Sequence, residues 1–349
     1  MTPGLQEKSI RIPVTIITGF LGSGKTTLLN NIIRKHPATR FAIIENEFGE
    51  MGIDSELLAG ENSTIYEIAN GCICCSLNGD FFLSLQNLIE RDMEFDHLLV
   101  ETTGIADPMS VIDLFISHPS LEKHFHVNSV ICLTDAASLE DILDLEADAR
   151  KQIALSDTII LNKIDLVRKK ELSQLRKLLA GINPMAEIVE TTWAQTNGTP
   201  LLDTFAYSHP HVEKTTLSFD NINLSLQDIR KDDPLPGAAL NGDSHRHDIS
   251  AEGFVFRDCF DMEMFNIWMS SFLYFNQNSL YRVKGILNFK NYNKRYIFQA
   301  VKGSYIFEEG SSWDESEARY SKIVFIGKYI RRSEIEKNLR KLFRSSGVY

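Results

Sequence analysis

A glycine-rich loop near the amino terminus constrains this chain more than any other feature of its sequence. Residues 19–26 read G-F-L-G-S-G-K-T and match the pattern G-x-x-x-x-G-K-[ST], with a β-branched run before them and a helical pattern after them. In that setting the glycines let backbone N–H groups curl around a β-phosphate at the positive end of a helix dipole. A glycine-rich turn that binds nothing is the alternative, and the strand–loop–helix context argues against it. The sequence therefore predicts a nucleotide-binding phosphate loop.

The side chains of this loop have separate expected roles. Lys25 would reach the β- and γ-phosphates and is a candidate catalytic residue, and Thr26 would ligate magnesium through its hydroxyl. The candidate nucleotide-binding residues of the loop are Gly19, Gly22, Ser23, Gly24, Lys25, Thr26 and Thr27.

A second nucleotide signal is the sequence E-T-T-G at residues 101–104, which begins at the last residue of an apolar strand pattern at 97–101. At the carboxyl end of a strand beside a phosphate loop, Glu101 can hold magnesium directly or through water, and it is the second candidate catalytic residue. Gly104 would let its backbone amide approach the γ-phosphate closely. Acids end many strands, so this segment gains its meaning from the phosphate loop that precedes it.

The third nucleotide signal is the box N-K-I-D at residues 162–165, which follows an apolar strand pattern. The Asp165 carboxylate can accept hydrogen bonds from guanine N1–H and the 2-amino group, whereas adenine would leave it unpaired at a cost of about 1–3 kcal/mol. Asn162 is expected to stabilise the loop and contact N7, and the Lys163 stem is expected to lie over the base. The alternative is a polar turn in which Asp165 caps a helix. The box predicts GTP rather than ATP.

Strand and helix patterns alternate from the amino terminus to about residue 203. This order predicts right-handed βαβ units, and hence an α/β domain with a mainly parallel sheet flanked by helices. Strands are expected at 12–18, 41–45, 64–68, 97–101, 130–134, 158–161 and 187–190, and helices at 26–35, 81–90 and 169–179.

The remainder of the chain has a different pattern. Proline, glycine and aspartate clusters predict a linker at 207–250, between a domain at 1–206 and a second domain at 251–349. The second domain shows strands without alternating helices, which predicts a smaller α+β domain. Its expected strands are 253–256, 279–287, 296–301 and 322–326, and its expected helices are 263–275 and 333–343.

Three of the five cysteines, Cys72, Cys74 and Cys75, lie within four residues. Thiolates are soft ligands that suit zinc or copper(I), and three of them leave an open fourth position on a tetrahedral metal, which suits a metal that must leave again. Because the cysteines follow an expected strand, they should lie near the carboxyl edge of the sheet, where the nucleotide also binds. Three cysteines packed as small hydrophobic residues are the alternative.

Neighbouring acids and histidines are further candidate ligands. Glu45 and Glu50 could complete the metal coordination, and Asp54 could contact magnesium as part of a switch; a solvated acidic loop is an equally good interpretation of this segment. His245 and His247, in the expected linker, could capture metal transiently, although loop histidines are more often plain exposed sequence.

The overall composition excludes several partners. The chain has 349 residues and a formal net charge of -11, so the basic face that nucleic acid or anionic lipid requires is not expected. No apolar run of about 18 residues is present, so no membrane span is expected. The polar residues 1–11 do not resemble a signal peptide. Reduced, crowded thiols favour the cytoplasm.

Together these motifs resemble those of the CobW-type metallochaperone GTPases. The resemblance rests on residues 19–27, 45–50, 71–75, 101–104, 106–108 and 162–165, and on Y-R-V-K-G at 281–285 for the second domain. It implies slow, magnesium-dependent GTP hydrolysis and binding of zinc or cobalt at Cys72, Cys74 and Cys75 with help from the acids at 45–50. It also implies delivery to a client metalloprotein, whose identity it does not give.

Two other functions stay open at this point. One is a nucleotide-dependent binding switch whose metal site is static and structural. The other is a P-loop kinase that acts on a small molecule, against which the guanine box argues. The sequence does not choose between a monomer and a homodimer.

Overall fold

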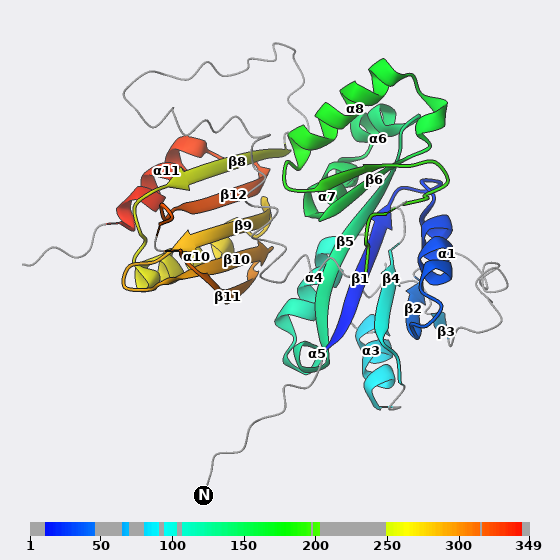
Figure 1. Cartoon of the computed structure of the whole chain (residues 1–349), viewed down its shortest axis with the longest axis horizontal. Coiled ribbons are helices and arrows are strands. Elements are labelled where there is room, and N and C mark those ends of the chain that lie inside the picture. The colour runs from blue at the N-terminus through cyan, green and yellow to red at the C-terminus, as the bar shows by residue number, and fades with distance from the viewer. Residues whose placement is uncertain are drawn as a thin grey trace, which may run out of the picture. The chain divides into compact units, whose positions relative to one another are not determined.

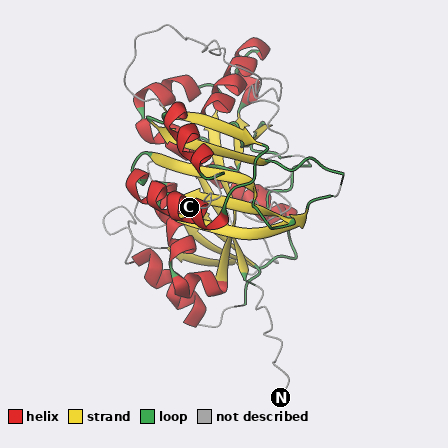
Figure 2. Ribbon diagram, turned by 90° about the vertical axis from the view of Figure 1, so that its left-hand side faces the viewer, coloured by secondary structure: helices red, strands yellow, loops and turns green. Residues whose placement is uncertain are grey.

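The computed structural model describes residues 11–45, 65–69, 80–90, 94–102, 107–196, 198–202, 249–314 and 316–343 (Figure 1). The chain forms two compact units. The first unit consists of Met1–Leu139, Ser156–Leu172 and Glu187–Ala206, and the second consists of Glu140–Leu155, Ser173–Ala186 and Tyr207–Tyr349. Helices flank the strands in this fold (Figure 2), and within the described ranges no helix is long and apolar enough to cross a membrane.

The first unit contains a seven-stranded sheet in the order β3-β2-β4-β1-β5-β6-β7, and every strand pair in it is parallel. The strand β1 therefore lies between β4 and β5, near the middle of the sheet (Figure 1). The strands are β1 (Ile12–Gly19), β2 (Phe41–Glu45), β3 (Ile65–Ala69), β4 (His97–Glu101), β5 (Phe125–Asp135), β6 (Thr158–Asn162) and β7 (Glu187–Glu190). This sheet confirms the α/β class that the alternating sequence pattern predicts.

The central strands contain apolar runs and are almost continuously buried, on both faces, as parallel sheets require. One face packs against α1 (Lys25–Lys35), whose Leu28, Leu29 and Ile32 join a core cluster with strand residues. The helix α4 (Pro108–Ser117) contacts β5 and β1, and Asp107 caps it by accepting a hydrogen bond from the Met109 N–H at 3.0 Å.

The other helical elements between the strands range from three to 14 residues in length. They are α3 (Asp80–Glu90), α5 (Pro119–His124), α6 (Leu139–Leu145), α7 (Ala147–Leu155), the 3₁₀ turn η1 (Ile164–Leu166) and α8 (Lys169–Ile182). The sequence pattern predicts α1, α3 and α8 but gives no clear signal for α4 to α7.

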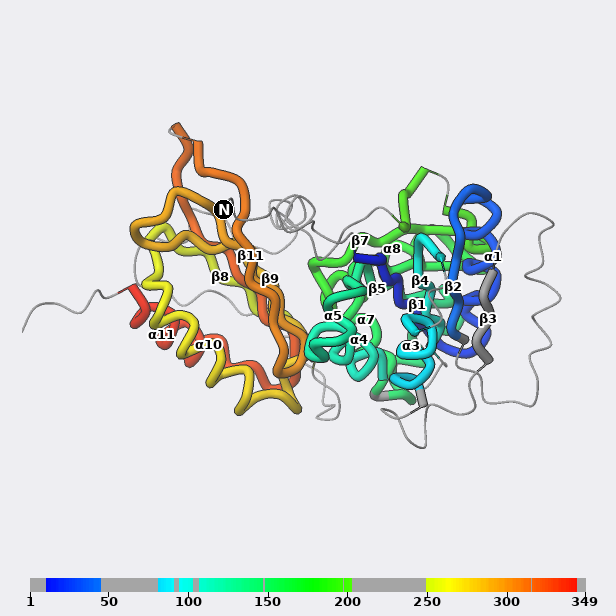
Figure 3. The backbone as a smooth tube through the Cα atoms, turned by 90° about the horizontal axis from the view of Figure 1, so that it is seen from below, coloured from blue at the N-terminus to red at the C-terminus, as the bar shows by residue number. Residues whose placement is uncertain are grey.

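The second unit contains a five-stranded antiparallel sheet in the order β11-β10-β9-β12-β8. Its elements are β8 (Ile249–Phe256), α10 (Met262–Asn276), β9 (Leu280–Asn288), β10 (Lys294–Val301), β11 (Ser304–Ser312), β12 (Ser321–Lys328) and α11 (Arg332–Lys341). The helices α10 and α11 lie together on one side of the sheet (Figure 3). This arrangement confirms the predicted α+β class, although the edge strand β11 was not expected.

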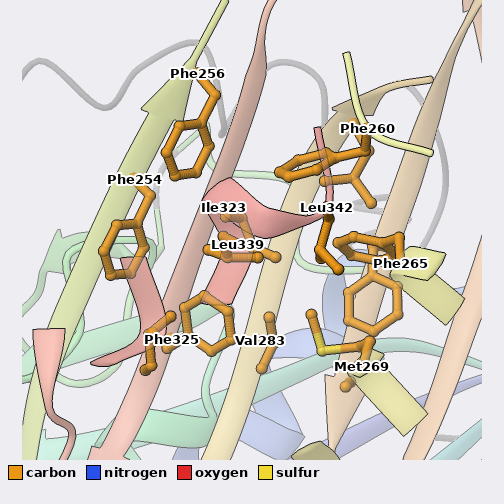
Figure 4. Packing of buried hydrophobic residues seen from close by; sticks show 14 of the residues in the cluster. Phe254, Phe256, Phe260, Phe265, Met269, Val283, Ile323, Phe325, Leu339 and Leu342 are labelled. Atoms are coloured by element: carbon orange, nitrogen blue, oxygen red, sulfur yellow. The ribbon is translucent and has the colours of Figure 1, made fainter. Parts of the chain in front are cut away.

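An aromatic core joins the two helices to this sheet (Figure 4). Phe265 on α10 makes edge-to-face contacts with Phe289 and Phe298, with ring centroids 5.6 and 5.7 Å apart. Phe254 on β8 meets Phe325 on β12 in the same way at 5.8 Å. Such pairs stabilise a core by about 0.5–1.5 kcal/mol beyond the area they bury.

The second unit also includes a helix from the amino-terminal half of the chain. Within this unit α7 contacts β9 and β8, and the fully buried Arg282 donates a hydrogen bond to the carbonyl oxygen of Leu155, the last residue of α7. A cation at the carboxyl end of a helix satisfies a carbonyl that lacks an intrahelical partner and complements the helix dipole. The arginine of the Y-R-V-K-G motif therefore has a structural role as a helix cap.

A buried polar network crosses the parallel sheet away from its carboxyl edge. The register between β1 and β5 shifts after Val14, and Asn128 is the extra residue of this bulge. The Asn128 side-chain N–H donates to Thr15 Oγ1 at 3.1 Å, and Thr15 Oγ1 lies 2.9 Å from His97 Nε2. Burial, with smaller contributions from His126 and His36, lowers the pKa of His97 to about 3.

This network makes stability depend on pH. His97 stays neutral in the folded chain, whereas an unfolded histidine binds a proton below a pKa of about 6.5. The unfolded state therefore binds more protons between pH 6.5 and about 3. As the pH is lowered through that window, we expect the free energy of unfolding to fall by up to about 1.4 kcal/mol per pH unit from this residue alone.

Urea unfolding of the wild type and of His97→Asn at pH 7 and at pH 5 would measure this effect. The variant loses the titrating group, so its stability should depend less on pH across this interval. The same replacement at the exposed His124 is the control. If the stability of the wild type and of His97→Asn depends on pH in the same way, His97 is not the source of the pH dependence.

Candidate functional site: a nucleotide site at the carboxyl edge of the parallel sheet

The phosphate loop joins β1 to α1 through backbone conformations that only glycine adopts readily. Gly19, Gly22 and Gly24 have φ values of 137°, 74° and 107°. A Cβ atom on Gly19 would lie 2.3 Å from the Leu133 carbonyl oxygen, and one on Gly24 would lie 2.7 Å from Asn162 Nδ2. The loop therefore needs these glycines both for its curvature and for its close approach to β5 and β6.

The polar groups of this loop fit a bound phosphate chain. Lys25 begins α1, is 8% exposed, and donates from Nζ to the carbonyl oxygens of Gly19 and Phe20 at 3.0 and 3.3 Å. The hydroxyl groups of Ser23 and Thr18 are buried and have no hydrogen-bond partner among the described residues. Because a buried hydroxyl is normally satisfied, these two groups are consistent with a ligand that supplies the missing partner. Thr26 and Thr27 occupy the first turn of α1.

Asn162, the last residue of β6, ties three segments together. Its side chain is 2% exposed and donates from Nδ2 to the Ser23 carbonyl oxygen in the phosphate loop at 2.9 Å. Its Oδ1 accepts hydrogen bonds from the Thr191 hydroxyl at 3.1 Å and from the Ala194 N–H at 2.9 Å. The phosphate loop, the guanine box and the segment after β7 are therefore held by a single buried amide.

The other two polar residues of the box differ in their environments. Lys163 has a left-handed backbone (φ 58°), and its Nζ forms an ion pair with Asp135 Oδ2 at 2.8 Å. This pair fixes the lysine stem beside the carboxyl end of β5. Asp165 lies in η1 and is exposed to solvent, so its carboxylate is accessible to a ligand.

The segment 191–196 was not identified from the sequence, and it is fixed from two sides. In addition to the bonds from Asn162, Asn31 on α1 donates from Nδ2 to the carbonyl oxygens of Trp193 and Ala194 at 3.0 and 3.1 Å. Lys35, also on α1, donates to the Thr196 carbonyl oxygen at 2.8 Å. These contacts join residues more than 100 positions apart, and no sequence pattern signals them.

The ends of β3, β2 and β4 lie level with one another at the carboxyl edge. The register pairs Glu45 of β2 with Ala69 of β3 on one side and with Glu101 of β4 on the other. Beyond β4, the Thr102 N–H donates to the Ile17 carbonyl oxygen of β1 at 2.9 Å, which holds this strand end beside the strand that leads into the phosphate loop. Glu101 is therefore next to β1, as the sequence leads one to expect for a magnesium-binding acid.

Several predicted site residues lie outside the described residues. They are Cys72, Cys74, Cys75, Glu50, Asp54, Gly104, His245 and His247, together with the side chain of Glu45. The two remaining cysteines are Cys132, whose thiol has its pKa raised to about 12 by burial, and the partly exposed Cys259. Within the part of the chain that the structure describes, no group of three or more histidine, cysteine and acidic residues could hold a metal ion.

The parallel sheet, its phosphate loop and the guanine box define the class of this protein, which is a P-loop GTPase. The chain belongs to the CobW family: residues 13–190 match the CobW/HypB/UreG nucleotide-binding domain, and residues 249–343 match the carboxyl-terminal domain of the cobalamin synthesis protein CobW.

Two curated relatives and one solved structure extend across most of this chain. It is 31% identical to the zinc chaperone YjiA of Escherichia coli, over 93% of this chain and 96% of that protein. It is 30% identical to zinc-regulated GTPase metalloprotein activator 1 of Schizosaccharomyces pombe, over 92% of this chain and 83% of that protein. The crystal structure of Zn(II)-bound YjiA GTPase from E. coli is similar at 27% identity and a TM-score of 0.68, covering 96% of this chain and 100% of that one.

The hydrogen bonds of Asn162 lead to a prediction with two readouts. Asn162→Ala leaves the buried Thr191 hydroxyl and the Ala194 N–H without an acceptor, at a cost of about 1–3 kcal/mol in unfolding free energy. The phosphate loop also loses its connection to the box, so GDP affinity should fall. Asn162→Asp keeps both acceptor bonds but loses the donor to Ser23, and it should retain more stability than Asn162→Ala.

Thr191→Val is the matched control, because it removes one of the three bonds and keeps the side-chain shape. Denaturant unfolding and titration with a fluorescent GDP analogue would measure the two effects. Wild-type stability and GDP affinity in Asn162→Ala would contradict the role of this side chain.

Proposed function

We propose that this GTPase is a metallochaperone that binds a divalent metal, zinc in the first instance and cobalt as the alternative cargo, at Cys72, Cys74 and Cys75. It hands this metal to a client metalloprotein, and the bound nucleotide sets the affinity for the metal. The relatives named as zinc chaperones and zinc-regulated activators support zinc as the cargo. The observation that carries the proposal is the level register of the strand ends at the carboxyl edge.

The guanine base is bound by the box at the end of β6. Asp165 accepts hydrogen bonds from N1–H and the 2-amino group of guanine, and its exposure leaves the carboxylate ready to do so. The Lys163 stem lies along one face of the base, held by the ion pair with Asp135. Asn162 positions the box against the phosphate loop.

The phosphates are bound by backbone N–H groups of residues 19–26 and by Lys25, which exchanges its present carbonyl partners for phosphate oxygens. Thr26, Glu101 and Asp54 are the proposed magnesium ligands, directly or through water. Magnesium, when bound, would neutralise charge on the β- and γ-phosphates. No arginine lies within the nucleotide motifs at 19–27, 101–104 and 162–165, so hydrolysis is slow in the absence of a partner.

The metal cargo is bound beyond the end of β3. The cysteine motif begins three residues after Ala69, the last residue of β3, and Ala69 is paired in register with Glu45. Glu45 is in turn paired with Glu101, next to the strand that carries the phosphate loop. Three strand spacings separate β3 from β1, which is about 14 Å. Glu45 or Glu50 supplies the proposed acidic ligand that completes the site beside the three thiolates.

This short span gives nucleotide and metal a route to influence each other. The cysteines lie in sequence between the two segments proposed as switches, residues 45–54 and 101–107. Nucleotide and magnesium order such segments, and hydrolysis releases them. Each nucleotide state then gives a different geometry to the metal ligands, and zinc is released in one of the two states.

The proposed binding of guanine at Asp165 predicts strong selectivity for GTP over ATP. Wild-type protein should bind GTP much more tightly than ATP, because adenine lacks the N1–H and 2-amino donors that Asp165 accepts from guanine. Asp165→Asn should weaken GTP binding and favour xanthosine triphosphate, whose 2-oxo group accepts a hydrogen bond from the amide. Isothermal titration with the three nucleotides would measure this, and equal wild-type affinity for ATP and GTP would refute the assignment.

The coupling predicts that zinc affinity differs between the GTP-bound and GDP-bound protein by about 5- to 150-fold, and that zinc changes nucleotide affinity by the same factor. Competition titration against a chromophoric zinc chelator would give both zinc affinities, with a non-hydrolysable analogue in place of GTP. The pH must be held constant, because each thiol loses a proton on binding.

Replacing Cys72, Cys74 and Cys75 together by serine should remove the nucleotide-dependent difference. Cys259→Ser is the matched control and should leave the difference intact, since this cysteine lies outside the motif. If zinc affinity in the wild type is the same in both nucleotide states, the metal site is static and the delivery hypothesis fails.

A further inference from the structure

Trp193 is an exposed aromatic residue on a strained backbone beside the guanine box. Its side chain is 73% exposed, although tryptophan is a residue that soluble proteins bury for most of its surface. Trp193 and Ala194 have successive φ values of 57° and 51°, in the left-handed region that bulky side chains rarely adopt. Strain of this kind persists only where surrounding contacts hold it, and it concentrates at functional sites.

The contacts that hold Trp193 come from the nucleotide site itself. Asn162 fixes the next residue through the Ala194 N–H at 2.9 Å, and Asn31 on α1 fixes the Trp193 carbonyl oxygen at 3.0 Å. The Ile164 N–H donates to the Thr191 carbonyl oxygen at 3.3 Å, so the box and the segment 191–194 run side by side. The backbone of Trp193 is therefore held rigidly next to the residues that read the base.

A comparison within the chain shows that exposure and positive φ are not sufficient. Tyr329 is 83% exposed and has a φ of 56°, but it belongs to the second unit, whereas Trp193 belongs to the unit that carries the phosphate loop and the guanine box. What distinguishes Trp193 is its connection to Asn162. The guanine box is also followed by an exposed apolar side chain, Leu166, which comes directly after Asp165 and is 62% exposed.

We propose that Trp193 forms one wall of the guanine pocket: its indole stacks on the base and determines affinity for guanine nucleotides, opposite the stem of Lys163. This inference rests on the proposed binding of guanine at Asn162 and Asp165. Lys163 is held back by its ion pair with Asp135 and covers one face of the base, which leaves the other face for an apolar, planar group. Stacking of a base on an aromatic side chain changes affinity by roughly 5- to 150-fold when the aromatic group is removed. Stacking shields the indole, which is otherwise in water, and the strained backbone keeps it in position before the ligand arrives.

Two substitutions separate the indole from the backbone. Trp193→Asn removes the aromatic ring and keeps a residue that tolerates the left-handed conformation, whereas Trp193→Phe keeps a ring. We expect Trp193→Asn to weaken GDP binding by roughly 5- to 150-fold and Trp193→Phe to retain most of the affinity. Tyr329→Asn is the matched control and should bind GDP as the wild type does. Isothermal titration with GDP gives the affinities, and denaturant unfolding shows that each variant is folded.

Tryptophan emission gives an independent readout. The chain has three tryptophans, and the other two, Trp268 and Trp313, lie in the second unit. Addition of GDP should quench emission in the wild type and in Tyr329→Asn but not in Trp193→Phe. Wild-type GDP affinity in a folded Trp193→Asn variant would overturn the inference while leaving the guanine assignment intact. Equal affinity of the wild type for ADP and GDP would instead overturn the proposed guanine site on which the inference rests.

Discussion

The nucleotide site depends on the side chain of Asn162 more than on any other single group. A primary amide has one acceptor oxygen and one donor nitrogen, and both are used here in a buried setting, toward the phosphate loop on one side and the segment 191–194 on the other. Because an unpaired buried donor or acceptor costs more than the bond itself contributes, loss of any one segment would destabilise the others. The amide thereby converts three loops of separate origin into one preorganised surface.

Parallel strand order explains how this surface is placed. In an open parallel sheet the ligand binds outside the carboxyl ends of the strands, and β1, β4, β5 and β6 each end in a group of the site. They contribute the phosphate loop, Glu101, Asp135 and Asn162 respectively. The neighbouring strands β2 and β3 extend the same edge, and the cysteine motif follows β3 in the sequence. The nucleotide site and the proposed thiolate site can therefore share one edge without sharing a residue, as the proposed metallochaperone function requires.

The parts of the fold that could be predicted are those encoded in local patterns. The β-branched run before the phosphate loop, the apolar runs that became β4 to β6, and the spacing of Leu28, Leu29 and Ile32 on α1 each signal their own structure. The edge strand β11 was missed because it is largely exposed and only Tyr305, Ile306 and Phe307 form an apolar run in it. The helix α7 has only nine residues, a mixture of charged and apolar ones, and its cap by Arg282 comes from a residue 127 positions away.

The residues of the site likewise fall into those that a local motif predicts and those that only the fold brings together. Motif residues such as Lys25 and Asp165 are recognisable because their chemistry needs a fixed spacing. Asp135, Asn31 and Trp193 carry no such signal, since what matters is where the fold brings them. Asp135 ends a strand as many acids do, and only its 2.8 Å contact with Lys163 gives it a role. Long-range partners of this kind are determined by topology, which a single sequence reveals only in outline.

We propose that three thiolates hold the metal and that its remaining ligand differs between the GTP-bound and the GDP-bound protein. Zinc K-edge X-ray absorption on the zinc-loaded protein tests this proposal most directly, with GDP and with a non-hydrolysable GTP analogue. We expect three sulfur ligands at about 2.3 Å in at least one state, together with one nitrogen or oxygen ligand, and a set of zinc ligands that changes between the two states. Four sulfur ligands, or a set of zinc ligands that is the same in both states, would contradict the proposal.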